Sequence, residues 1–227
     1  METEIPGHDI VWRGQRLASW SLESSLDRLA RTLGLQQDAD LRDRHRSEFL
    51  YAIRGRRGEN PVELKAEQDV FALGQHQGLV TPLVDWTAAP FAALFFAFAE
   101  DHVKGERTHR AVFGLDRTVV EEYCNAKFKT NPAPQLQFYR PITNDNPRLV
   151  SQCGLFTLAP TGKTIEQWLA EHFKGDSVPV LTKYSIPGTD RPEVLKALHR
   201  MNINHLSLFP DLYGASMFCN LRLELSR

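Results

Sequence analysis

The hydrophobic residues of this chain are concentrated near its centre, where an apolar strand leads into an apolar helix. Residues 91–99 form an unbroken apolar run, and a helix that is apolar on all sides must be buried. This run is far too short to cross a bilayer, which requires about 20 residues. Residues 79–86 are apolar and follow a turn at Gly78, which is typical of an interior strand. The pattern predicts a strand followed directly by a buried helix.

The other segments alternate between helical and strand-like patterns. Helices are predicted at residues 22–33, 38–57, 62–77, 118–127, 164–172 and 191–201, with a final helix that starts near Pro210. Further strands are predicted at residues 9–15, 110–115, 148–159 and 180–186, and a Pro- and Asn-rich loop at residues 130–147. We therefore expect an α+β fold with a mixed β-sheet flanked by helices. Since no linker is apparent, residues 1–227 are predicted to form a single domain.

The composition narrows the classes of function. The 27 basic and 28 acidic side chains nearly balance, so no overall field would attract nucleic acid or an anionic membrane. Cys124, Cys153 and Cys219 are widely spaced and show no zinc-binding pattern, which favours reduced thiols in a cytosol. The first ten residues lack the features of a signal peptide. We expect a cytoplasmic protein with no metal site and no membrane partner.

Candidate binding residues gather where the central strand meets the central helix. These residues are Thr81, Asp85, Trp86 and Thr87. The edge of a sheet beside a helix N-terminus favours polar or anionic ligands. The alternative is structural: Thr87 would cap the helix, Pro90 would sit in its first turn, and Asp85 would accept backbone N–H groups.

A second candidate lies at the end of the first strand, where Arg13, Gly14 and Gln15 follow one another. A guanidinium donates two parallel hydrogen bonds to a phosphate or carboxylate, and a glycine allows a ligand to approach the backbone closely. The alternative is that Arg13 forms an ordinary ion pair. His76, at the end of the helix before the central strand, has no second ligand at metal-binding spacing and is considered a ligand-binding candidate only.

The strand predicted at residues 148–159 contains Gln152 and Gly154 between apolar neighbours. A glycine inside a strand indicates a bulge or a close approach of a ligand, and the alternative is a simple irregularity of the sheet. Both residues are therefore candidates for the same site.

Four segments in order resemble the FRG domain, which is named for a Phe/Trp-Arg-Gly signature near its N-terminus. The segments are VWRGQ, GQHQGLVTPLVDWTAAPFAALFFA, NPRLVSQCGLFTLAP and INHLSLFPDLYGAS. This family is widespread in bacteria and phages, often in or near defence systems. The resemblance therefore implies a bacterial protein with a role in phage defence or as a toxin.

A remoter resemblance links the order of elements to the ADP-ribosyltransferase fold. By this similarity Arg13 occupies the first motif, Thr87 the second, ahead of an Ala-rich helix, and Gln152 the third, where those enzymes carry a catalytic Glu. The resemblance implies that NAD is the substrate. Arg13 would bind its pyrophosphate or a ribose hydroxyl, Thr87 would orient the nicotinamide ribose, and Trp86 or His76 would contact a ring.

The chemistry of NAD cleavage tests this assignment. Breaking the bond between nicotinamide and ribose builds positive charge on the ribose, which a nearby carboxylate stabilises. Gln152 carries no charge, so Asp85 or Glu48 would have to supply it. We therefore expect either an ADP-ribosyltransferase or NAD glycohydrolase with a protein or nucleic-acid acceptor, or a non-catalytic module that senses a nucleotide or nucleic acid. A nuclease is a third alternative, although no carboxylate cluster at metal-binding spacing is visible.

Overall fold

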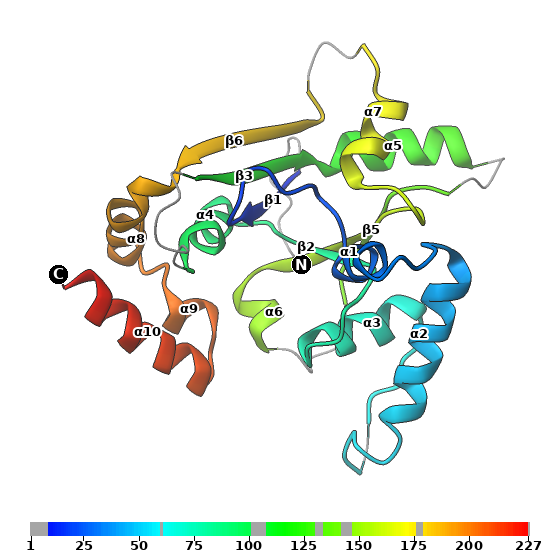
Figure 1. The fold of residues 1–227 in the computed structure, drawn as a ribbon, viewed down its shortest axis with the longest axis horizontal. Coiled ribbons are helices and arrows are strands. Elements are labelled where there is room, and N and C mark those ends of the chain that lie inside the picture. The colour runs from blue at the N-terminus through cyan, green and yellow to red at the C-terminus, as the bar shows by residue number, and fades with distance from the viewer. Residues whose placement is uncertain are drawn as a thin grey trace.

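The computed structural model describes residues 9–59, 61–100, 108–129, 134–141, 147–175 and 179–226. A six-stranded sheet with the order β4-β5-β2-β1-β3-β6 organises these residues (Figure 1). The strands are β1 (Ile10–Gln15), β2 (Leu83–Thr87), β3 (His109–Asp116), β4 (Gln137–Tyr139), β5 (Gly154–Leu158) and β6 (Leu181–Pro187). Every strand pair within the described residues is antiparallel. The α+β fold class predicted from the sequence is confirmed, but the prediction of a mixed sheet is wrong, since these strand pairs are all antiparallel.

Helices cover both faces of this sheet. They are α1 (Ser25–Thr32), α2 (Ala39–Ala52), α3 (Glu67–His76), α4 (Pro90–Phe98), α5 (Arg117–Phe128), α6 (Pro147–Ser151), α7 (Ile165–His172), α8 (Arg191–Arg200), α9 (His205–Leu208) and α10 (Leu212–Leu225), with a 3-10 turn at Gly188–Asp190. Figure 1 shows α8, α9 and α10 at the left of the sheet, with α8 next to the end of β6. It shows α2 and α3 at the lower right. No helix in the described ranges is long and apolar enough to cross a membrane.

One face of the sheet forms the largest apolar core. Val11, Trp86 and Phe113 contribute from the strands, and Val120 from α5 and Trp168 from α7 pack against them. On the other face α4 and α8 pack over β1 and β3, and α3 packs over β2 and β5. Because side chains alternate along a strand, Asp85 and Thr87 belong to this second face, on the opposite side from Trp86.

Glycine on β1 allows the central helix to approach the sheet. A Cβ added to Gly14 would lie 1.9 Å from the Ala93 carbonyl oxygen and 2.6 Å from the Ala97 nitrogen. The small residues of α4 thus lie directly against the strand backbone, and Pro90 at the first turn starts the helix without a lost hydrogen bond. The prediction of a buried helix after the central strand is confirmed, and the helix occupies Pro90–Phe98.

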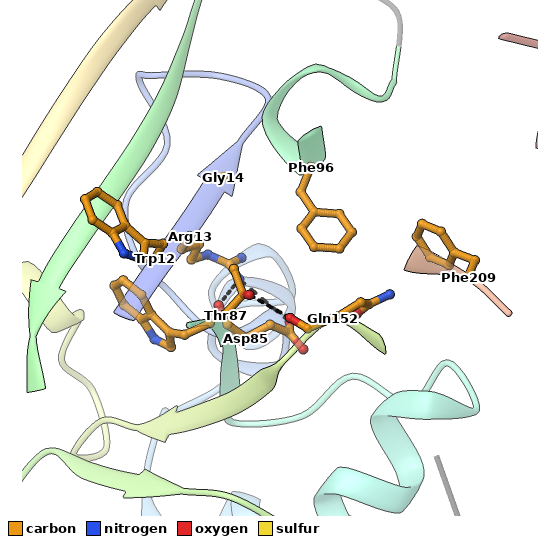
Figure 2. A pocket seen from close by; sticks show the side chains of 9 residues that line it. Trp12, Arg13, Gly14, Asp85, Thr87, Phe96, Gln152 and Phe209 are labelled. Atoms are coloured by element: carbon orange, nitrogen blue, oxygen red, sulfur yellow. Dashed lines mark hydrogen bonds and ion pairs between the residues drawn. The ribbon is translucent and has the colours of Figure 1, made fainter. Parts of the chain in front are cut away.

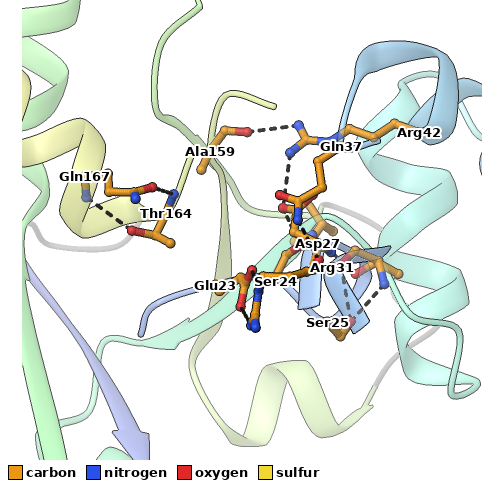
Figure 3. Close-up of polar contacts among 12 residues, drawn as sticks. Glu23, Ser24, Ser25, Asp27, Arg31, Gln37, Arg42, Ala159, Thr164 and Gln167 are labelled. Carbon is orange, nitrogen blue, oxygen red and sulfur yellow. Dashed lines mark hydrogen bonds and ion pairs between the residues drawn. The ribbon is translucent and has the colours of Figure 1, made fainter. Parts of the chain in front are cut away.

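A buried polar network joins α1, α2 and the end of β5 (Figure 3). Arg42 Nη1 donates to the Ala159 carbonyl at 2.9 Å, and Arg42 Nη2 lies 3.3 Å from Asp27 Oδ2. The hydroxyl of Ser24, which caps α1, donates to the same Asp27 oxygen at 2.7 Å. Both charged side chains are less than a tenth exposed. This network fixes the two N-terminal helices to the sheet.

Several predicted boundaries require correction. The strand predicted at residues 148–159 is wrong in its first part, because Pro147–Ser151 is the helix α6 and the strand begins only at Gly154. The helix predicted at residues 62–77 begins later, at Glu67, where Asp69 accepts the N–H groups of Lys65 and Ala66. The loop predicted at residues 130–147 contains the short edge strand β4, and residues 130–133 and 142–146 lie outside the described ranges.

Candidate functional site

A cavity of about 240 Å³ lies beside the central strands on the face covered by α4 (Figure 2). It is lined by Trp12, Arg13, Gly14, Asp85, Trp86, Thr87, Phe96, Gln152 and Phe209. These residues come from β1, β2, α4, the turn before β5 and the segment after α9. Six of them belong to the sequence-predicted site, so segments far apart in the chain meet at one cavity.

The cavity lies where β1 and β2 separate. The two strands share one residue pair, Trp12 with Thr87, whereas β1 pairs with β3 along its whole length. Beyond this pair the Asp85 carbonyl accepts a hydrogen bond of 2.7 Å from Arg13 Nη1. The Arg13 side chain thus takes the place of a backbone N–H as the donor to this carbonyl. We call the region where β1 and β2 separate the β1–β2 seam, and the cavity lies along it.

Arg13 and Asp85 form the charged part of the cavity. Arg13 Nη1 lies 3.7 Å from Asp85 Oδ2, and the two side chains are 21% and 62% exposed. Burial lowers the pKa of Arg13, while the carboxylate of Asp85 acts in the opposite direction. The guanidinium nevertheless stays protonated, since no protein environment deprotonates arginine. Arg13 Nε is buried without a hydrogen-bond partner among the described residues. The pair therefore offers both a cation and an accessible carboxylate to a ligand.

A glutamine of α3 holds the carboxylate of Asp85 in position. Gln75 Nε2 donates to Asp85 Oδ1 at 2.6 Å, and Gln75 Oε1 accepts the Thr81 hydroxyl. Thr81 is fully buried and its N–H donates to the Ser25 hydroxyl at 2.9 Å. Asp85 does not cap the central helix through the backbone, contrary to the structural alternative, because its carboxylate contacts Gln75 and Arg13.

Thr87 and Gln152 are hydrogen-bonded to each other and line the cavity. The Thr87 hydroxyl donates to the Gln152 carbonyl at 2.6 Å and accepts the Ala89 N–H at 3.0 Å. The Gln152 amide Nε2 donates to the Leu208 carbonyl at 3.1 Å. Thr87 does not cap α4 as the structural alternative proposed, because Ala89 is the N-cap residue and the Thr87 hydroxyl accepts the N–H of Ala89 itself. Both polar side chains are engaged within the protein.

Three aromatic rings shape the rest of the cavity. The rings of Phe96 and Phe209 meet edge to face at 6.1 Å, and in Figure 2 they lie across the cavity from Arg13 and Trp12. Trp12 packs over Gly114, where an added Cβ would come within 2.9 Å of the indole. Aromatic walls of this kind bind a planar or cationic ring.

Trp86 belongs both to the cavity lining and to the apolar core. It lines the cavity, but its side chain is 3% exposed and its indole N–H donates to the Thr157 hydroxyl at 2.9 Å. Its indole therefore contributes mainly to the core on the opposite face of the sheet.

The other four predicted residues do not line the cavity. They are Gln15, His76, Thr81 and Gly154. Gln15 is buried and donates to the Ser21 carbonyl at 3.2 Å, and His76 is the last residue of α3. Gly154 pairs regularly with Thr87, so the expected bulge at this position is wrong. Gln152 lies in the turn after α6 rather than in a strand, next to Cys153, whose φ is +48°.

Trp12, Phe96, Phe209 and Gln75 were not among the predicted site residues. Trp12 stands inside one of the segments that resemble the FRG domain, Gln75 and Phe96 stand inside a second, and Phe209 stands inside a third. Their position inside these segments is the one feature of the sequence that could have identified them as site residues. Phe96 lies within an apolar run whose pattern indicated only burial. Among the described residues no group of three or more His, Cys, Asp or Glu side chains is placed to hold a metal ion.

Comparison with known proteins gives one match. The family model of the FRG domain matches residues 8–106. The matched range includes Arg13, Asp85, Thr87 and Phe96, whereas Gln152 and Phe209 lie beyond it. No curated protein and no solved structure matches the chain. The region that is similar to the FRG domain therefore supplies β1, β2 and α4, and with them most of the cavity lining.

Proposed function

We propose that the cavity at the β1–β2 seam binds the nicotinamide–ribose end of an NAD-type nucleotide for an ADP-ribosyltransferase-like reaction. The observation that carries this proposal is the pairing of an accessible carboxylate, Asp85, with a guanidinium, Arg13, opposite an aromatic wall. The nicotinamide ring of NAD is cationic and planar, so it suits Phe96 and Phe209 as well as a nearby carboxylate.

The size of the cavity sets which part of the nucleotide it would hold. Pockets for drug-sized ligands have volumes of about 300–1,000 Å³. A cavity of about 240 Å³ would therefore take one ring and its ribose, not a whole dinucleotide. The pyrophosphate would lie at the opening, within reach of the Arg13 guanidinium, which is 21% exposed.

Asp85 is the residue that would support the chemical step. As the glycosidic bond breaks, nicotinamide leaves with the bonding electron pair and the ribose carbon becomes positively charged. Asp85 is the carboxylate that lines the cavity, while Glu48 is exposed on α2 and does not line it. The acceptor, a protein, a nucleic acid or water, would then attack the ribose carbon and release its proton. A role in bacterial defence or toxicity follows from the resemblance to the FRG family.

A second candidate function is that of a non-catalytic nucleotide sensor. The hydrogen bonds of Thr87 and Gln152 favour it, because both side chains that the transferase analogy assigns to catalysis already have partners within the protein. Such a module would bind the nucleotide and leave the chemistry to a partner protein.

Nicotinamide release and transfer of labelled ADP-ribose, measured with purified protein, NAD and cell lysate, would test the proposal. We expect label on a macromolecule for a transferase, or free ADP-ribose for a glycohydrolase, and a loss of at least about 100-fold in Asp85→Asn. Asp43→Asn, at a surface ion pair on α2, is the matched control and should retain activity.

Binding measured by calorimetry separates the two candidates. NAD binding without nicotinamide release, weakened in Arg13→Gln, would support the sensor and contradict the enzyme. The absence of both binding and turnover in a folded protein would contradict both candidates.

A further inference from the structure

The C-terminal helix α10 rests on the protein through one narrow stripe. Gly214 is buried, and Phe218, Leu221 and Leu225, which follow at intervals of three or four residues, are partly buried. Leu212 and Leu223, outside the stripe, are 86% and 73% exposed. A helix with this spacing presents one apolar face inward.

Both ends of α10 are fixed by charge. At its start Asp211 caps the helix and accepts a hydrogen bond of 2.6 Å from Arg148 Nε. Near its end Glu224 pairs with Arg191, which also donates from Nε to the Phe98 carbonyl at 2.9 Å. The helix is thus held at two points, and the space below its middle depends on the side chains between them.

A second cavity of about 240 Å³ lies in this space, between α10 and α8. Its lining is Phe95, Leu195, Lys196, His199, Arg200, Ile203, Asn204, Phe218, Leu221, Arg222, Leu225 and Ser226. Figure 1 places α8, α9 and α10 together at one end of the molecule. This second cavity shares no lining residue with the cavity at the β1–β2 seam. Protein interiors are normally closely packed, so an apolar hollow of this size beside a fixed helix is a candidate binding site.

The rim of this cavity is basic. Lys196, Arg200 and Arg222 are exposed, and within the described ranges no carboxylate lies at ion-pair distance from any of them. Arg222 lies over the Phe218 ring at 5.9 Å, and His199 contacts the same ring at 5.7 Å. Other arginines of this region, Arg148 and Arg191, have carboxylate partners. Three cations above an apolar floor favour an anionic ligand with an apolar body.

We propose that the cavity between α8 and α10 binds a single-chain amphiphile with a carboxylate head, of the fatty-acid class. The acyl chain would lie among Leu195, Ile203 and Leu221, and the carboxylate would meet Arg200 and Arg222 at the rim. This site is separate from the cavity at the β1–β2 seam, and binding here depends on none of the residues of that cavity.

Calorimetric titration with decanoate, below its micelle concentration, tests the proposal on the whole chain. We expect wild type to bind decanoate and to bind the neutral analogue decanol at least about tenfold more weakly, since a charge-assisted contact is lost. The double variant Arg200→Gln/Arg222→Gln should lose about the same factor for decanoate. Arg44→Gln, at an exposed arginine of α2, is the matched control and should bind as wild type does.

A second variant tests the floor independently of charge. Ile203→Trp should fill the cavity and abolish binding, while an unchanged far-UV spectrum shows that the fold is kept. Failure of wild type to bind decanoate, or equal affinity for decanol and decanoate, would overturn the proposal. A dimer of wild type in sedimentation that Ile203→Trp disrupts, without decanoate binding, would also overturn it, in favour of a second copy of the chain as the occupant.

Discussion

Arg13 and Arg42 each face an aspartate and a backbone carbonyl, yet the two pairs differ in what surrounds them. Arg42 and Asp27 are 9% and 7% exposed, the Ala159 carbonyl accepts a hydrogen bond from Arg42, and the Ser24 hydroxyl donates one to Asp27. Asp85, by contrast, is 62% exposed beside Arg13, in a cavity lined by aromatic rings. The same two residue types thus form a structural link in one place and an accessible charged site in the other, and solvent access makes the difference.

Breaking the buried pair should have the largest effect. Asp27→Asn leaves Arg42 as a buried charge without its counter-ion, so the free energy of unfolding should fall by about 3–5 kcal/mol. Urea denaturation would measure it. Asp85→Asn is the matched comparison at the open pair and should cost less than about 1 kcal/mol. Equal losses in the two variants would contradict the distinction drawn between the pairs.

A methyl group at Gly14 should disturb the packing of α4 beside the open pair. Because the added Cβ would meet the backbone of α4 at Ala93, Gly14→Ala should destabilise the fold by about 1–3 kcal/mol and weaken any ligand binding at the seam. In Gly74→Ala the nearest atom is the flexible end of Leu79, so a smaller change is expected. Thermal unfolding with nucleotide titration would measure both. A neutral Gly14→Ala would show that α4 can move away from β1.

Protonation of the buried His205 side chain should have the smallest effect on the free energy of unfolding. Burial lowers the pKa of His205, helped by nearby Arg191, and its Nδ1 has no hydrogen-bond partner among the described residues. The unfolded chain therefore binds a proton more readily, and stability should fall as the pH drops below about 6.5. Urea midpoints between pH 5 and 7.5 would measure this slope. His205→Phe keeps the aromatic contacts with Phe95 and Phe209 and should reduce the slope; an unchanged slope would assign it to other groups.

Local patterns predicted much of the fold because they depend on neighbouring residues. The unbroken apolar run located α4, and the Pro210–Asp211 pair located the start of α10. Residues 148–151 were assigned to a strand because Leu149 and Val150 continue the apolar pattern of β5, although Pro147 favours a helix start. Short apolar runs do not distinguish the two structures without tertiary contacts.

The site was less accessible to prediction than the fold. Arg13, Asp85 and Thr87 are polar residues within or at the end of short apolar strands, where they are visible in the sequence. Phe209 reaches the same cavity from a segment more than a hundred residues away, and Gln75 acts through Asp85 from another helix. Sequence alone does not say that β1 and β2 are neighbours, nor that they share a single residue pair. The cavity exists only because these two strands are neighbours that separate after one residue pair.

Because β1 and β2 share a single residue pair, the sheet consists of two groups of fully paired strands. On one side β1, β3 and β6 are paired along their lengths, and on the other β2, β5 and β4 are paired in the same way. Between them stand one backbone pair and the bond from Arg13 to the Asp85 carbonyl. The apolar core of Val11, Trp86 and Phe113 joins the two halves on one face of the sheet. On the other face, a ligand that bridges Arg13 and Asp85 would add a polar connection where the backbone supplies a single pair.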